Sequence, residues 1–157
     1  MTGRGYPRRV ARAGDDLRAD AASPPPATTA AELIYATYFV LQAVVGVALW
    51  LAYAASPAVR TWVGLVPTRP AVTAAFVYPD LGVIVLGSLL SAWTIRRRAP
   101  SAVPWSAFTA GGVLYPTLYL LGWVSATNRT GEHVLAIMIP PALLSSWIAY
   151  QVWRTRR

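Results

Sequence analysis

FVYPDLGVIVLGSLLSAWTIRRR, residues 76–98, contains one acid, Asp80, in a run that otherwise has the composition of a membrane helix and ends at three arginines. A helix needs about 20 predominantly apolar residues to cross roughly 30 Å of hydrocarbon. The apolar run extends back to residue 71 and therefore reaches that length. The stretch predicts a transmembrane helix and raises the question of what a carboxylate does inside it.

The composition of the whole chain is typical of a membrane protein. Of its 157 residues, 55% are hydrophobic and 13% are charged, whereas a soluble domain carries about a quarter charged residues. A net charge of +8 would suit nucleic acid in a soluble protein, but arginines beside apolar segments set membrane orientation instead. We therefore expect no nucleic-acid partner. The chain has no cysteine, which excludes disulfides, thiolate metal ligands and cysteine nucleophiles.

Four apolar segments follow a polar stretch rich in arginine and proline, residues 1–31, for which the sequence predicts a disordered cytoplasmic tail. Because the segments are joined by short loops, we expect an all-α membrane protein, an antiparallel up-down bundle of four transmembrane helices within residues 32–157. Small residues four apart in the second segment, such as Gly87 with Ser91, favour close helix contact. The expected helices span about residues 33–56, 71–95, 102–126 and 134–153.

The distribution of arginine predicts the orientation of this bundle. Of the 14 arginines, 11 lie in the tail, in the second loop and at the C-terminus, and only Arg60, Arg69 and Arg129 lie in the other two loops. The positive-inside rule then places both termini in the cytoplasm. The composition, rich in alanine and with arginine as its only basic residue, resembles that of GC-rich bacteria, so we expect the plasma (inner) membrane. Seven tryptophans, mostly near segment ends, fit the membrane–water interfaces.

Two interpretations of Asp80 remain open. The residue lies about 24 Å along a helix from Arg96, which puts it in the outer leaflet near the boundary of the hydrocarbon. Because Pro79 precedes it, Asp80 could begin a helix and serve as an interface anchor, and Tyr78 would then be non-helical. Alternatively, Asp80 is an intramembrane acid facing the bundle interior. Its candidate partners at the same level are His133, Glu132 and Asn128.

A pocket between helices is a second candidate site. Pro116 lies within the third segment, and Pro140 and Pro141 lie within the fourth. Proline bends a membrane helix, and bends in two helices can open a cavity between them. The polar side chains that could line such a cavity are those of Tyr115, Tyr119, Gln42 and Ser145.

These features support three hypotheses of function. The first is a non-enzymatic membrane protein, either an accessory or assembly subunit or a protein that binds a lipophilic small molecule between its helices. The second is a proton-coupled carrier of a small solute or lipid, and the third is an enzyme acting on a lipid headgroup, both using Asp80 and His133. The sequence has no nucleotide-binding, paired-histidine or serine-hydrolase motif, so we favour the first hypothesis and expect no metal and no cofactor. The expected partners are the lipid bilayer, other membrane proteins or a second copy, and a lipophilic ligand.

Overall fold

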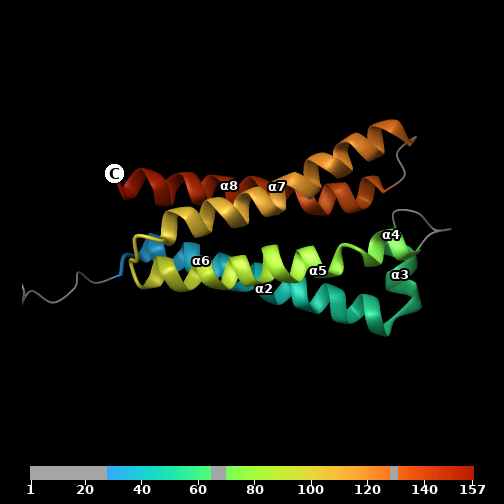
Figure 1. Cartoon of the computed structure of the whole chain (residues 1–157), viewed down its shortest axis with the longest axis horizontal. Coiled ribbons are helices and arrows are strands. Elements are labelled where there is room, and N and C mark those ends of the chain that lie inside the picture. Colours follow the sequence, from blue (N-terminus) through green and yellow to red (C-terminus); the bar gives the residue numbers. More distant parts are fainter. Residues whose placement is uncertain (1–27, 65–69, 128–130) are drawn as a thin grey trace, which may run out of the picture.

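The computed structural model describes residues 28–64, 70–127 and 131–157, and within them the chain is all-α. The elements are α2 (Ala30–Ala55), α3 (Pro57–Val63), α4 (Pro70–Ala74), α5 (Val77–Pro79), the π-helical turn η1 (Asp80–Val85), α6 (Leu86–Arg96), α7 (Ala102–Ala126) and α8 (Glu132–Thr155). The tail to residue 27, Arg69, Asn128 and Arg129 lie outside the described residues. Four long apolar helices pack antiparallel (Figure 1), as the sequence predicts.

Four helical stretches are long and apolar enough to cross a membrane: Ala30–Ala55, Ala71–Arg96, Ala102–Ala126 and Glu132–Thr155. Many of their large apolar side chains are exposed; Val45 and Leu51, for example, are each 65% exposed. Lipid is the solvent in which such a surface is stable, because exposing it to water would be strongly unfavourable. The chain is thus a multi-pass membrane protein in contact with the bilayer.

The first helix, α2, begins directly after Thr29, which forms a capping box with Glu32. The Thr29 hydroxyl accepts a hydrogen bond from the Glu32 amide at 3.2 Å, and the Glu32 carboxylate accepts one from the Thr29 amide at 2.9 Å. This reciprocal capping box satisfies two backbone donors that have no partner inside the helix. Ala30 and Ala31, assigned to the tail from sequence, therefore belong to α2.

The helices associate mainly as two pairs, α2 with α6 and α7 with α8, and α6 joins the pairs through α7. Close approach of α6 and α7 depends on small residues. A Cβ added to Gly87 would lie 2.8 Å from the Thr109 hydroxyl, and the Ser91 and Thr109 hydroxyls are 3.0 Å apart. Gly87 and Ser91 are both buried, so this expected small-residue contact is present. α2 and α8 come into close contact at only a few positions.

Each end of the bundle has its own core. At the arginine-bearing end, Phe39 of α2 and Ile95 of α6 are fully buried together with Ile148 of α8. At the opposite end, Leu120 of α7 packs with Leu135 of α8. Between the second core and α2 the packing is incomplete, and this is where the candidate site lies.

Candidate functional site

Asp80 lies inside a continuous helical segment and does not begin a helix. α5 runs directly into η1 at Asp80, and the Asp80 amide donates to the Phe76 carbonyl at 2.9 Å. Asp80 is therefore not the first residue of this helical segment, which begins three residues earlier at Val77, and Tyr78, expected to be non-helical, is part of α5. Proline disfavours helical geometry at the residue before it, and the chain departs from α-helical geometry on both sides of α5, at the turn of residues 75–76 and at η1. π-Helical turns of this kind occur frequently at functional sites.

The Asp80 carboxylate is partly buried and has one hydrogen-bond donor. Trp50 Nε1 of α2 donates to Asp80 Oδ2 at 3.2 Å. Asp80 forms no ion pair with another described residue, and the ion pairs of the described chain join Glu32 to Arg98 and Arg156. A carboxylate removed from water with a single neutral donor is an unfavourable arrangement unless another group compensates its charge.

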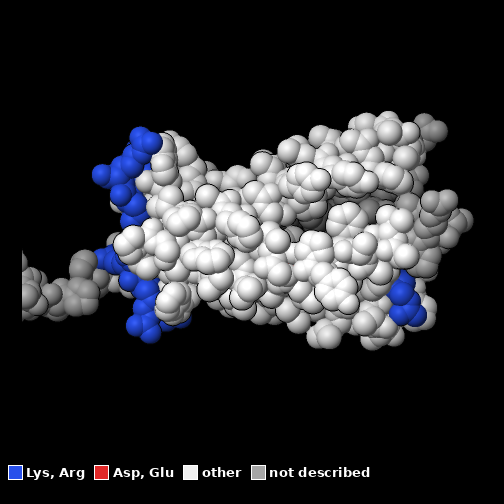
Figure 2. Space-filling model, viewed as in Figure 1, with Lys and Arg blue, Asp and Glu red and all other residues white. Residues whose placement is uncertain are grey.

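Asp80 lines two adjacent hollows, which together we call the Asp80 cavity. The α7-side hollow has a volume of about 110 Å³ and the α2–α8 hollow a volume of about 300 Å³. The two share four lining residues: Leu49, Trp50, Asp80 and Met138. The space-filling view shows the molecule hollowed in the half away from the arginine cluster, between α7 and the α4–α5 segment (Figure 2). The α2–α8 hollow lies where contact between α2 and α8 is slight.

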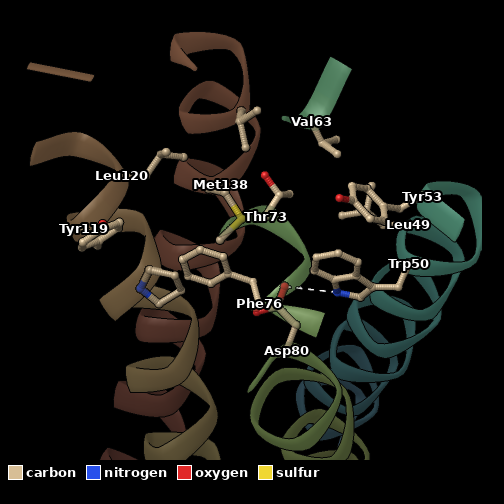
Figure 3. Close-up of a pocket in the computed structure, with 12 residues that line it drawn as sticks. Leu49, Trp50, Tyr53, Val63, Thr73, Phe76, Asp80, Tyr119, Leu120 and Met138 are labelled. Atoms are coloured by element: carbon tan, nitrogen blue, oxygen red, sulfur yellow. Dashed lines mark hydrogen bonds between the residues drawn. The ribbon is translucent and has the colours of Figure 1, made fainter. Parts of the chain in front are cut away.

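The walls of the α7-side hollow are almost entirely apolar and aromatic. The Trp50 indole lies beside Asp80, and Phe76 and Tyr119 approach from the other side with Met138 above them (Figure 3). Val63 of α3 and Thr73 of α4 close the end. Apolar walls with one strongly polar group are the usual composition of a small-molecule site.

A second polar group lies in the α2–α8 hollow. The Tyr38 hydroxyl donates to the Pro141 carbonyl at 3.0 Å and lies 3.0 Å from the Ser145 hydroxyl, which in turn donates to Gln42 Oε1 at 2.9 Å. Gln42 Nε2 is buried and has no hydrogen-bond partner among the described residues. Gln42, Tyr38 and Pro141 line the hollow, whereas Ser145 is buried behind them.

His133 is near the cavity but is engaged elsewhere. Its Nε2 lies 2.6 Å from the Trp62 carbonyl oxygen, and its ring lies 5.4 Å from the Trp62 ring. This contact holds α3 against the start of α8, next to Val134, which lines the α7-side hollow. Asp80 and His133 are therefore at the same end of the bundle but bond to different groups. Glu132 is the first residue of α8, and Asn128 lies outside the described residues.

The two tyrosines expected in a pocket have different positions. Tyr119 lines the α7-side hollow, and Pro116 lines it too. Tyr115 is 73% exposed and lines neither hollow. Pro116 lies within α7, and Pro140 and Pro141 lie within α8, as the sequence predicts.

Sequence reasoning did not include Trp50, Leu49, Phe76 and Met138 among the candidate residues, although all four line the cavity. In the sequence, Trp50 is one of the tryptophans that fit the membrane–water interfaces, and its hydrogen-bond partner Asp80 lies 30 residues further along the chain. No local pattern indicates such a pairing. One sequence signal does indicate α3, the helix that supplies Val63 to the cavity. Ser56 precedes Pro57 at the start of this helix, and Ser56 Oγ accepts a hydrogen bond from the Val59 amide.

In the part of the chain that the structure describes, no three His, Cys, Asp or Glu side chains gather in a group able to hold a metal ion. Comparison with protein-family models, with curated proteins and with solved structures finds no significant match.

Proposed function

We propose that this chain is a non-enzymatic membrane protein that binds a lipophilic small molecule in the Asp80 cavity. The observation that carries the proposal is an apolar and aromatic cavity, within a helix bundle, that contains one carboxylate lacking an ion-pair partner in the described chain. Such a cavity offers burial for a lipophilic body and one polar group to orient it.

The accessory-subunit alternative and the two hypotheses based on a paired Asp80 and His133 have less support. A proton carrier or a headgroup enzyme built on that pair needs the two side chains to act together, but each bonds to a tryptophan of a different element. The contact of His133 with Trp62 holds α3 against α8, whereas the contact of Asp80 with Trp50 lies at the wall of the cavity. An accessory subunit needs no cavity at all.

A matched pair of substitutions in α2 tests the proposal. Leu49 lines both hollows, whereas Leu51, two residues further, lines neither and is 65% exposed. In Leu49→Trp the larger ring should fill the cavity, and in Leu51→Trp it should extend into the surrounding detergent. The probe is N-phenyl-1-naphthylamine, a lipophilic molecule that is uncharged at neutral pH.

The measurement is the midpoint of thermal unfolding in maltoside micelles with increasing probe. A ligand that binds only the folded state stabilises it by about 2.7 kcal/mol at 100 times its dissociation constant. We expect the probe to raise the midpoint of the wild type and Leu51→Trp but to have little effect on Leu49→Trp. Equal responses in all three proteins, or no response in any, would contradict the proposal.

A further inference from the structure

The Asp80 cavity combines a carboxylate with aromatic rings, and this combination has a chemical preference of its own. Trp50 and Phe76 flank the carboxylate, and Tyr119 and Tyr53 complete the aromatic part of the wall (Figure 3). The faces of aromatic rings attract cations, most strongly where water is excluded. A carboxylate attracts the same cation by charge and repels an anion.

We propose that the ligand of this cavity is a lipophilic organic cation, a protonated amine or an onium group on an apolar body, and that Asp80 recognises its charge. The inference rests on the proposed function, because it names the chemical class of the molecule bound there. The positive group lies against Asp80 and the Trp50 ring, at the junction of the two hollows. The apolar body fills the α2–α8 hollow, whose walls include Val45, Ile84 and Ile137.

The charges of the described chain favour this assignment. Arginine side chains of the described residues form their bonds at the two ends of the bundle. Arg98 and Arg156 pair with Glu32 at one end, and Arg60 donates to the Tyr53 and Ala54 carbonyls at the other, where it caps α2. No described basic side chain lines either hollow. A bound cation therefore supplies the positive partner that the partly buried carboxylate lacks among the described residues.

The charge of the cavity wall favours a free molecule over a membrane lipid. An aminophospholipid carries a phosphate beside its ammonium group, and no described basic side chain lines the cavity to receive it. We therefore assign the cavity to a free cation and treat the aminophospholipid as an alternative outcome of the test.

Two probes of nearly equal size and opposite charge separate the effect of charge from that of burial. They are tetraphenylphosphonium, a permanent cation, and tetraphenylborate, a permanent anion. The net charge of the chain is +8, so non-specific attraction favours the borate, and a preference for the phosphonium must come from a local site. Unfolding midpoints are measured as for the neutral probe, in uncharged maltoside micelles.

We expect the wild type to bind tetraphenylphosphonium at least about tenfold more tightly than tetraphenylborate, because the cation gains both the ion pair and the aromatic contacts. Asp80→Asn keeps an oxygen for Trp50 Nε1 but removes the charge, and should lose this preference. Asp80→Glu keeps the charge and should retain it, which shows that the loss does not come from misfolding.

The outcomes distinguish this inference from the proposed function. If the two tetraphenyl probes bind equally and Asp80→Asn has no effect, the cation assignment is wrong while cavity binding that depends on Leu49 stands. If no probe gives a response that Leu49→Trp abolishes, the proposed function fails as well. If added phosphatidylethanolamine displaces tetraphenylphosphonium from the wild type, the occupant is a lipid headgroup and the assignment to a free cation is overturned.

Discussion

Glu32 joins three parts of the arginine-bearing end through one carboxylate. Its Oε2 accepts from Arg98 Nη2 at 2.7 Å, its Oε1 accepts from Arg156 Nη2 at 3.3 Å, and Arg156 Nη1 also donates to the Arg98 carbonyl at 2.9 Å. Arg98 has a φ of 52°, in the left-handed region that non-glycine residues rarely adopt. The ion pair with Glu32 helps to hold this turn between α6 and α7 and ties it to α2 and α8.

Removal of the Glu32 charge should destabilise the bundle. The three side chains are only 19–24% exposed. The loss in the free energy of unfolding should therefore lie between the loss for a surface ion pair and the loss for a fully buried ion pair. We expect Glu32→Gln to lower the free energy of unfolding by about 2 kcal/mol. The measurement is denaturant unfolding in mixed micelles.

The control for Glu32→Gln is Arg154→Gln, which removes an exposed charge from the last turn of α8, where Arg154 forms no ion pair with another described residue. It should change the free energy of unfolding by less than about 0.5 kcal/mol. Equal losses in the two variants would mean that net charge, and not the Glu32 ion pairs, stabilises this end.

The local role of Glu32 could be predicted from sequence, but its ion pairs could not. An acid in the first helical turn after Thr29 is a short-range pattern, and the capping box follows from it. The two arginines are 66 and 124 residues away along the chain. Any of the arginines at this end could have been the partner, because only the packing of the helices decides which guanidinium comes within reach.

At the scale of elements, the contact between α7 and η1 depends on one glycine. A Cβ added to Gly112 would overlap Val83 Cγ1, whereas a Cβ added to the adjacent Gly111 would meet nothing within 4 Å. Val83 is β-branched and cannot easily rotate away. α7 can therefore approach the π-helical turn this closely only because residue 112 has no side chain.

Gly112→Ala should separate α7 from η1 and destabilise the protein by about 1–3 kcal/mol, the usual cost of overpacking. Gly111→Ala adds the same methyl group on the exposed face of the same helix and should be neutral or stabilising by up to about 1 kcal/mol, since alanine is the better helix former. The measurement is the midpoint of thermal unfolding in micelles. A Gly111→Ala variant as unstable as Gly112→Ala would show that helix flexibility, not contact with Val83, is what matters.

The four long helices could be predicted from the sequence, whereas their interruptions could not. Apolar length fixes a membrane helix to within a few residues, as the expected 33–56 and observed Ala30–Ala55 show. The π-helical turn at Asp80–Val85 has no such signature in the sequence, and its Val83 and Val85 lie close to Gly112 of α7 and Gly46 of α2. The candidate site lies at this interruption, and the hydrogen bond from Trp50 of α2 to Asp80, 30 residues away in the sequence, could not be predicted.

At the scale of the whole molecule, the charges are segregated along the bundle axis. The basic side chains gather at the end formed by the α6–α7 turn and the C-terminus, and a single basic patch lies at the opposite end (Figure 2). Neighbour relations among the helices were not readable from sequence, because helices surrounded by lipid are apolar on all sides. The cavity between α2, η1 and α8 is thus a property of packing alone.

By the positive-inside rule, this segregation of charge predicts how the protein is oriented in the membrane. The end with Arg96 to Arg98, Arg154, Arg156 and Arg157 should face the cytoplasm, and the end with α3 should face outward. The chain has no cysteine, so a single introduced thiol reports one position. Thr61 in α3 and Thr155 at the end of α8 are both exposed and lie at opposite ends of the bundle.

In spheroplasts of bacteria expressing the protein, a membrane-impermeant maleimide should label Thr61→Cys at once and Thr155→Cys only after permeabilisation. The cysteine-free parent is the control for background labelling, and equal labelling of both variants after permeabilisation shows that both thiols are reactive. The reverse pattern would place the α3 end in the cytoplasm. The Asp80 cavity, which lies toward that end, would then face the inner leaflet, and its ligand would have to come from the cytoplasmic side.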